Sequence, residues 1–214
     1  MNKKVTNFLT YNFLFIIGSF FIAWATFSLI NNRIYEVKEN ERINIFIESP
    51  TCLDSSYISD FDTKMKDKHS EIYETNFYYY SGSNSNVTDY YEKYGKTSDL
   101  IILSKTGLDV LKEKDMLSEY FYPISDSMNS KINSNSSLEV YKDKDNKFTY
   151  GYTMYSKENT SYNTKFALEK KFKLEIDSDY VLLINYDSKN FSLEEKTGYT
   201  SFGFDAINVL MELA

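Results

Sequence analysis

The longest apolar run of the chain lies at its start. Residues 13–30 contain no charged side chain, whereas Lys3 and Lys4 precede this run and Arg33 follows it. An α-helix rises 1.5 Å per residue, so about 20 residues cross the ~30 Å hydrocarbon core of a bilayer. A basic flank holds the N-terminus in the cytoplasm. The pattern therefore predicts a single-pass helix in the cell membrane over residues 9–30, with the rest of the chain extracytoplasmic.

Residues 1–30 are either an uncleaved signal anchor or a cleaved signal peptide. The "AWA" triplet, Ala23 to Ala25, fits a small-x-small cleavage site, and cleavage there predicts a secreted protein. The apolar run continues past this site to Ile30, which favours the anchor. A buried core helix is a third interpretation. The length of the run, its lack of charge and its N-terminal position oppose it.

The hydrophobic pattern changes beyond residue 30. Residues 31–42 are polar and charged and predict a juxtamembrane linker. Apolar or β-branched runs then alternate with amphipathic stretches, which predicts one extracytoplasmic domain over residues 43–214. The expected strands are 42–49, 71–80, 98–104, 147–156 and 179–188. The expected helices begin near Asp54 and Thr106 and also cover residues 87–95, 163–175 and 200–214.

The alternation of strands and helices indicates an α/β fold with a mainly parallel sheet flanked by helices. The third expected strand ends in "LIILS", residues 100–104, and is apolar without alternation. Such a pattern is typical of a strand covered on both faces. Residues 129–147 are polar and have no apolar period, so they predict a flexible connection with a turn near Asp145 and Asn146.

Charge and cysteine content restrict the class of protein. The 214 residues carry a net charge of −7, and residues 1–30 hold two Lys and no Asp or Glu, so the remainder carries −9. An acidic domain argues against a nucleic-acid partner, which needs a basic face. Cys52 is the only cysteine, so an intramolecular disulfide framework is excluded and stability depends on packing.

The sequence motifs do not indicate catalysis or a cofactor. His69 is the only histidine, and it follows a predicted helix among charged residues, where solvent exposure is expected. A Ser-His-Asp triad would have to use His69, and the sequence has no nucleophile elbow. It also has no phosphate-binding glycine loop, dinucleotide fingerprint or metal-ligand spacing. We therefore expect a non-enzymatic protein without a cofactor or a metal.

Polar side chains follow the first three expected strands. Ligands of open α/β sheets meet the carboxyl ends of the strands, where hydroxyl groups and the N–H groups of helix starts suit sugars or anions. Tyrosines of the fourth expected strand could add aromatic faces. Ordinary caps and turns are the competing explanation. The candidate ligand-binding residues are Ser49, Pro50, Thr51, Ser81, Gly82, Ser83, Ser104, Lys105, Thr106 and Tyr152.

Two expected strands read "INIFIES" and "SDLIILS", and the expected helix after the second reads "GLDVLKEKDMLSEYFYPISD". These segments resemble bacterial extracytoplasmic solute-binding proteins of the type II periplasmic-binding fold. The segment "YGYTMYS" lies where the family's chain crosses to a second lobe. The resemblance covers residues 43–155 and, more loosely, 179–214.

The resemblance implies one lobe of a periplasmic-binding protein that captures a small polar solute, such as a sugar, for an ABC importer. Its implied partners are the solute and the transporter permease or another membrane protein. Only about 60 residues follow the crossing strand, so the second lobe is shortened or absent. The alternative is a degenerate lobe that acts as a surface interaction or accessory protein without a small-molecule ligand.

Overall fold

The computed structural model describes most of the chain. The described residues are 3–34, 37–49, 53–80, 87–133, 138–141, 150–156, 178–193 and 197–213. The chain divides into two compact units, Met1–Val37 and Lys38–Ala214. Within the first unit, side chains are described at residues 12, 13, 15–31 and 37.

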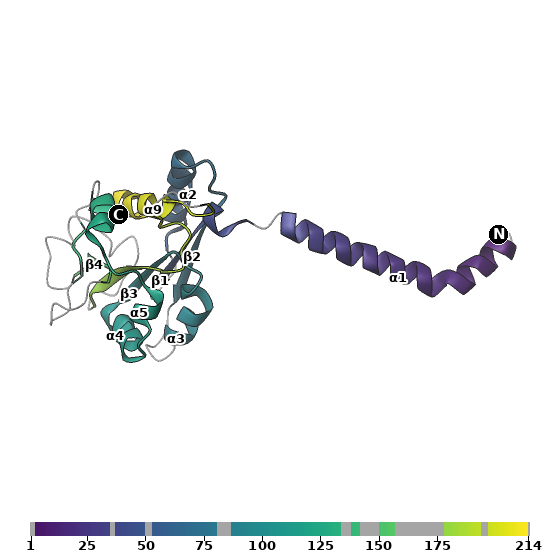
Figure 1. Ribbon diagram of the computed structural model, residues 1–214, viewed down its shortest axis with the longest axis horizontal. Coiled ribbons are helices and arrows are strands. Elements are labelled where there is room, and N and C mark those ends of the chain that lie inside the picture. The colour runs from purple at the N-terminus through teal and green to yellow at the C-terminus, as the bar shows by residue number, and fades with distance from the viewer. Residues whose placement is uncertain are drawn as a thin grey trace. The chain divides into compact units, whose positions relative to one another are not determined.

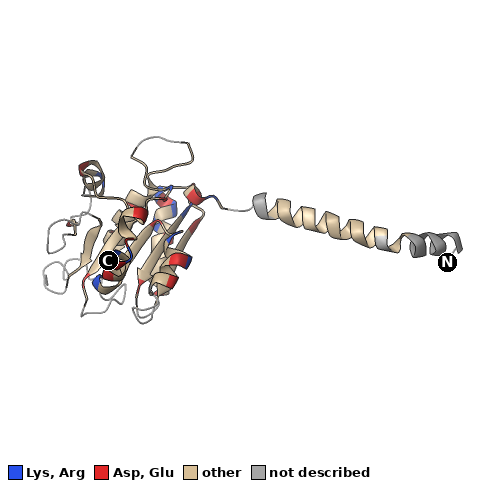
Figure 2. Ribbon diagram, turned by 60° about the horizontal axis from the view of Figure 1, so that its bottom comes forward, with Lys and Arg blue, Asp and Glu red and all other residues tan. Residues whose placement is uncertain are grey.

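The first unit contains the helix α1 (Lys3–Ile34), which the apolar run predicts. Its described side chains include no charged residue (Figure 2). Its large apolar side chains, among them Phe15, Phe20 and Trp24, are exposed. In the described parts of the chain, no helix combines the length and the apolarity needed to cross a membrane. The role of residues 9–30 as a membrane anchor or signal segment stays a prediction.

A five-stranded sheet forms the middle of the second unit (Figure 1). Each strand falls within one of the runs that the sequence predicts. The strands are β1 (Arg42–Glu48), β2 (Glu74–Tyr80), β3 (Leu100–Ser104), β4 (Tyr152–Tyr155) and β5 (Tyr180–Ile184). They lie in the order β2-β1-β3-β5-β4, and the pairings of β1 with β2 and with β3 are parallel.

The expectation of a mainly parallel sheet is wrong, because β5 enters the sheet in the opposite direction. β5 lies between β3 and β4 and is antiparallel to both, with Leu183 opposite Ile101 and Val181 opposite Thr153. Every residue of β5 is buried. A fully apolar strand fits the middle of a sheet in either direction, so its pattern does not reveal the direction. The α/β class is confirmed, with a mixed sheet flanked by helices.

Helices cover both faces of the sheet (Figure 1). One face packs against α2 (Ser55–Lys68), α6 (Asp126–Asn133) and α9 (Phe202–Leu213). The other is covered by α3 (Val87–Tyr90), the π-helical turn Tyr91–Gly95, α4 (Lys105–Glu113) and α5 (Leu117–Tyr120).

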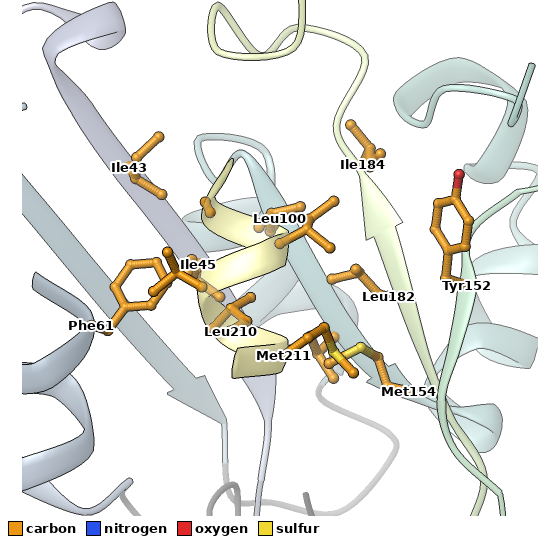
Figure 3. Close-up of a cluster of buried hydrophobic side chains, with 14 of the residues drawn as sticks. Ile43, Ile45, Phe61, Leu100, Tyr152, Met154, Leu182, Ile184, Leu210 and Met211 are labelled. Carbon is orange, nitrogen blue, oxygen red and sulfur yellow. The ribbon is translucent and has the colours of Figure 1, made fainter. Parts of the chain in front are cut away.

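Residues of β1 alternate between two hydrophobic cores, one on each face of the sheet. Ile45 packs in the same core as Phe61 of α2 and Leu210 of α9 (Figure 3). Phe46 belongs to the core under α4, with Leu108. Because both faces are covered, β1 and β3 have apolar residues at successive positions, as the sequence predicts for β3. Burial of these side chains drives the folding of the second unit.

The helix α2 begins where the sequence predicts. The Asp54 carboxylate accepts a hydrogen bond from the backbone N–H of Ser56 at 2.9 Å and caps the helix. Tyr57, Phe61 and Met65 are spaced four residues apart and form its buried face. This face packs on the sheet and beside α9.

His69 follows α2 and is not the solvent-exposed residue that the sequence predicts. Its Nε2 lies 2.9 Å from Oδ2 of Asp205, and its ring packs against Phe202 with the centroids 4.2 Å apart. Only 19% of its side-chain area is exposed. The pair joins the C-terminal end of α2 to the N-terminal end of α9, where the helix dipoles favour a basic and an acidic group respectively.

The prediction of an irregular connection over residues 129–147 is wrong at its start. Residues 126–133 form α6, and Met128 and Ile132, four positions apart, are buried in the core. Two apolar residues among Ser, Asn and Lys are too few to show a helical period in the sequence. The expected helix 163–175 and the expected turn at Asp145 and Asn146 lie outside the described residues.

Candidate functional site

The carboxyl ends of β1, β2 and β3 meet at one edge of the sheet, which we call the carboxyl edge. The buried Ser49 follows β1, and its backbone N–H donates to the carbonyl of Tyr80 in β2 at 3.0 Å. Ser104 ends β3, and its hydroxyl accepts a hydrogen bond from the N–H of Gly107 at 3.0 Å. The candidates Pro50, Thr51, Ser81, Gly82 and Ser83 lie outside the described residues.

A carboxylate of the protein itself occupies the N-terminal end of α4. The backbone N–H of Ser104 donates to Oε2 of Glu48 at 2.8 Å, and Glu48 is buried. A Cβ atom on Gly107 would lie 2.3 Å from the same oxygen, so the close approach of Glu48 requires glycine there. The partial positive charge of the helix end stabilises this carboxylate. Two backbone N–H groups that could bind a ligand at this corner are therefore already hydrogen-bonded within the protein. The N–H of Ser104 donates to Glu48, and the N–H of Gly107 donates to the Ser104 hydroxyl.

The other described candidates are two neighbours of Ser104 in the first turn of α4 and one tyrosine of β4. Lys105 is half-buried and Thr106 exposed in the first turn of α4. Tyr152 is fully buried in β4 (Figure 3), and its hydroxyl has no hydrogen-bond partner among the described residues. Burial raises the pKa of this hydroxyl. The Tyr152 ring thus lies in the core and does not offer the aromatic face that the sequence predicts.

A pocket of about 610 Å³ opens at the opposite edge of the sheet, which we call the amino-edge pocket. It lies at the amino ends of β1 and β3, and the turn after β5 forms one of its walls because β5 ends at this edge. Its volume is typical of small-molecule sites. Its lining includes Arg42, Asp99, Tyr122, Tyr186, Lys189 and Tyr199.

The buried Asp99 carboxylate accepts hydrogen bonds at the base of this pocket. The backbone N–H of Asn44 donates to Oδ2 at 2.8 Å, and the side-chain amide of Asn190 donates to Oδ1 at 3.0 Å. The hydroxyl of Ser188 bonds to Oδ1 as well. Burial raises the pKa of Asp99 to about 6, against the opposing effect of these three donors and of the Arg42 charge. The carboxyl group therefore titrates close to neutral pH.

Two asparagines fix the walls of the pocket to the backbone. The side-chain amide of Asn185 lies 2.9 Å from the carbonyl of Ser98 and 3.0 Å from that of Lys96. The amide of Asn190 donates to the carbonyl of Arg42 at 2.9 Å. These bonds hold the turn 185–190 against the starts of β1 and β3. The fold itself therefore holds the polar lining of the pocket in place.

Tyrosines and charged groups surround the pocket. The rings of Tyr122 and Tyr186 lie 4.7 Å apart, and Tyr186 is 54% exposed. Lys189 lies 5.0 Å from the centroid of the Tyr199 ring. Aromatic faces beside hydroxyl, amide and charged groups suit the reversible binding of a polar solute. Among the described residues, no group of three or more His, Cys, Asp or Glu side chains could hold a metal.

Comparisons with known proteins found no family model, curated protein or solved structure that matches the chain.

The amino-edge pocket is not predicted by the sequence pattern, because the rule that ligands meet the carboxyl ends of strands holds for parallel strands. β5 is antiparallel, so its carboxyl end lies at the other edge. The sequence contains one indication of this pocket, the segment "NYDSKN" at residues 185–190. It consists of polar residues and one tyrosine, and it directly follows the apolar strand β5. Asp99 gave a weaker signal, because a carboxylate directly before a buried strand is unusual.

The titration of Asp99 predicts a specific dependence of stability on pH. Its pKa in the folded state, about 6, lies above its ordinary value of 3.8, so the native state binds the proton more tightly. The stability contributed by the protonated group is complete below about pH 4 and is lost as the pH rises through about 6, by up to about 3 kcal/mol. We expect Asp99→Asn to remove this part of the pH dependence in urea unfolding between pH 4 and 7.

The matched control is Asp187→Asn, which removes an exposed carboxylate of the same pocket. It is expected to retain the wild-type slope of unfolding free energy against pH. Equal slopes for Asp99→Asn and the wild type would contradict the assignment of this titration to Asp99.

The Glu48 corner predicts a difference between two substitutions. Glu48→Ala leaves the N–H of Ser104 buried without this acceptor, which costs about 1–3 kcal/mol of unfolding free energy. Glu48→Gln keeps an acceptor oxygen and is expected to cost less. Urea unfolding at pH 7 measures both values, and an equal loss for the two variants would show that the hydrogen bond to Ser104 is not the stabilising contact.

Proposed function

We propose that the second unit, Lys38–Ala214, binds a small polar solute reversibly in the amino-edge pocket. The observation that carries the proposal is the pocket itself, which has about 610 Å³ and combines tyrosines with buried, already oriented polar groups. Tyrosine faces pack on the apolar faces of a sugar ring, and amide, hydroxyl and charged groups bond to its substituents. A sugar-like solute fits this lining. The proposed mechanism is binding without covalent chemistry.

The proposed setting is the outer side of a cell membrane, with residues 9–30 as anchor or signal segment. The exposed apolar side chains of α1 and the absence of charge among its described side chains support this role. The resemblance to extracytoplasmic solute-binding proteins favours delivery of the solute to the permease of an ABC importer. The solute and the permease are the proposed partners.

One observation favours a second candidate, a degenerate binding lobe that acts as a surface interaction or accessory protein. At the carboxyl edge, Glu48 fills the position where an anionic or polar ligand would meet the N-terminal end of α4. A protein that had lost a ligand at this edge would gain stability from such an internal substitute. The two candidates differ in whether any small solute binds at all.

Solute binding is tested on the full-length chain in a mild detergent. A ligand that binds only the native state, at a concentration 100 times its Kd, adds about 2.7 kcal/mol to the stability of the protein. The melting temperature of the protein therefore rises. We expect at least one member of a panel of neutral sugars, acidic sugars and amino acids to produce such a shift. Tyr186→Ala is expected to weaken its binding roughly 2- to 10-fold in calorimetric titration, because one ring face is lost.

The matched control is Tyr90→Ala. Tyr90 is 40% exposed and also packs on another tyrosine, Tyr80, but it does not line the amino-edge pocket. It is expected to leave the Kd unchanged. If no panel member shifts the melting temperature, and a membrane protein co-purifies with the chain, the interaction candidate replaces solute binding.

The membrane role of residues 9–30 is tested by fractionation of bacterial cells that express the chain. The full chain is expected in the membrane fraction, and a chain without residues 1–30 in the soluble fraction. Cleavage after Ala25 would instead give an exported protein whose N-terminal residue is Thr26, which mass spectrometry identifies. If the full chain remains soluble inside the cell with its N-terminus intact, both the anchor and the signal-peptide interpretations are contradicted.

A further inference from the structure

Arg42 is an unusual residue in this chain. The sequence contains 24 basic residues, and only Arg33 and Arg42 are arginines. Arg33 lies in α1, and Arg42 begins β1 and lines the amino-edge pocket. A guanidinium group differs from an ammonium group in its planar fork of donors, which matches the two oxygens of a carboxylate or phosphate. The single arginine of the second unit therefore lies among the residues that line the proposed ligand site.

The donors of Arg42 are not used by the described protein. Its Nε is buried and has no hydrogen-bond partner among the described residues. Its guanidinium forms no ion pair with any carboxylate in the described part of the chain. A buried donor without an acceptor costs free energy, so native proteins rarely retain one. An acceptor from outside the chain would remove this cost.

The other cations of the pocket are less available than Arg42. Lys189 lies 3.9 Å from Glu39, and Lys96 pairs with Glu92. The Asp99 carboxylate already accepts hydrogen bonds from Asn44 and from the turn after β5. Arg42 thus remains as the cation of the pocket with free donors, among the residues described.

We infer that the solute of the amino-edge pocket carries an oxyanion, a carboxylate or a phosphate, that binds the guanidinium of Arg42. The inference rests on the proposed function and narrows its ligand class to an acidic sugar or a similar polar acid. The tyrosines contact the ring of the solute, and Arg42 binds its charged group. Selectivity for an acid over the neutral analogue follows, because the neutral analogue leaves the Arg42 donors unpaired.

The test compares three solutes of similar size on the full-length chain in detergent at pH 7. The probes are glucuronate, glucose 6-phosphate and glucose, which present a carboxylate, a phosphate and neither group. We expect one of the two acids to bind roughly 10- to 100-fold more tightly than glucose in calorimetric titration. The preferred acid identifies which oxyanion the site takes. Arg42→Gln is expected to reduce its affinity to the level of glucose, and Arg42→Lys to give an intermediate value because the fork is lost.

Arg33→Gln is the matched control, because it removes the chain's other arginine and is expected to leave every Kd unchanged. Urea unfolding without ligand shows whether the Arg42 variants fold normally. If Arg42→Gln folds and binds the acids as tightly as the wild type, or if glucose binds as tightly as the acids, the inference is overturned while the proposed function stands. If none of the three probes and no member of the wider panel binds the wild type, both are overturned.

Discussion

The second unit depends on one buried carboxylate, that of Asp99. Its oxygens accept hydrogen bonds from the start of β1 and from the turn that follows β5. Parallel and antiparallel parts of the sheet are thereby joined at the amino edge by a side chain and not by the sheet ladder alone. The cost of burying this group is offset by three donors only in part, since its pKa remains raised.

The two edges of the sheet solve the same electrostatic problem in different ways. At the carboxyl edge, the helix end and the strand ends bond to Glu48, so this corner is internally satisfied. At the amino edge, the asparagines of the 185–190 turn bond to backbone carbonyls and leave a polar cavity open between them. In this sheet the polar pocket thus lies at the edge where a turn and two strand starts leave space between them, and the carboxyl-edge corner is filled by Glu48.

Much of the fold could be predicted from the hydrophobic pattern, because apolar runs and caps are local. The strands, the Asp54 cap and the buried face of α2 follow from residue type and spacing. The direction of β5 could not be predicted, since it depends on which neighbours a uniformly apolar strand finds. The candidate residues that the sequence offers therefore lie at the other edge of the sheet from the amino-edge pocket. Asp99 and Asn190 are 91 positions apart, and no periodic pattern links residues at such a distance.

The contact between Gly107 and Glu48 has a consequence for the evolution of this chain. A side chain at position 107 requires the Glu48 carboxylate to move or to be replaced, because the added Cβ atom would lie 2.3 Å from its Oε2. The two positions are 59 residues apart and belong to different elements, yet they are in direct contact. Descendants of this sequence that vary at one position are expected to vary at the other, so covariation between positions 48 and 107 would record whether the corner still holds its own carboxylate or has opened to a foreign one.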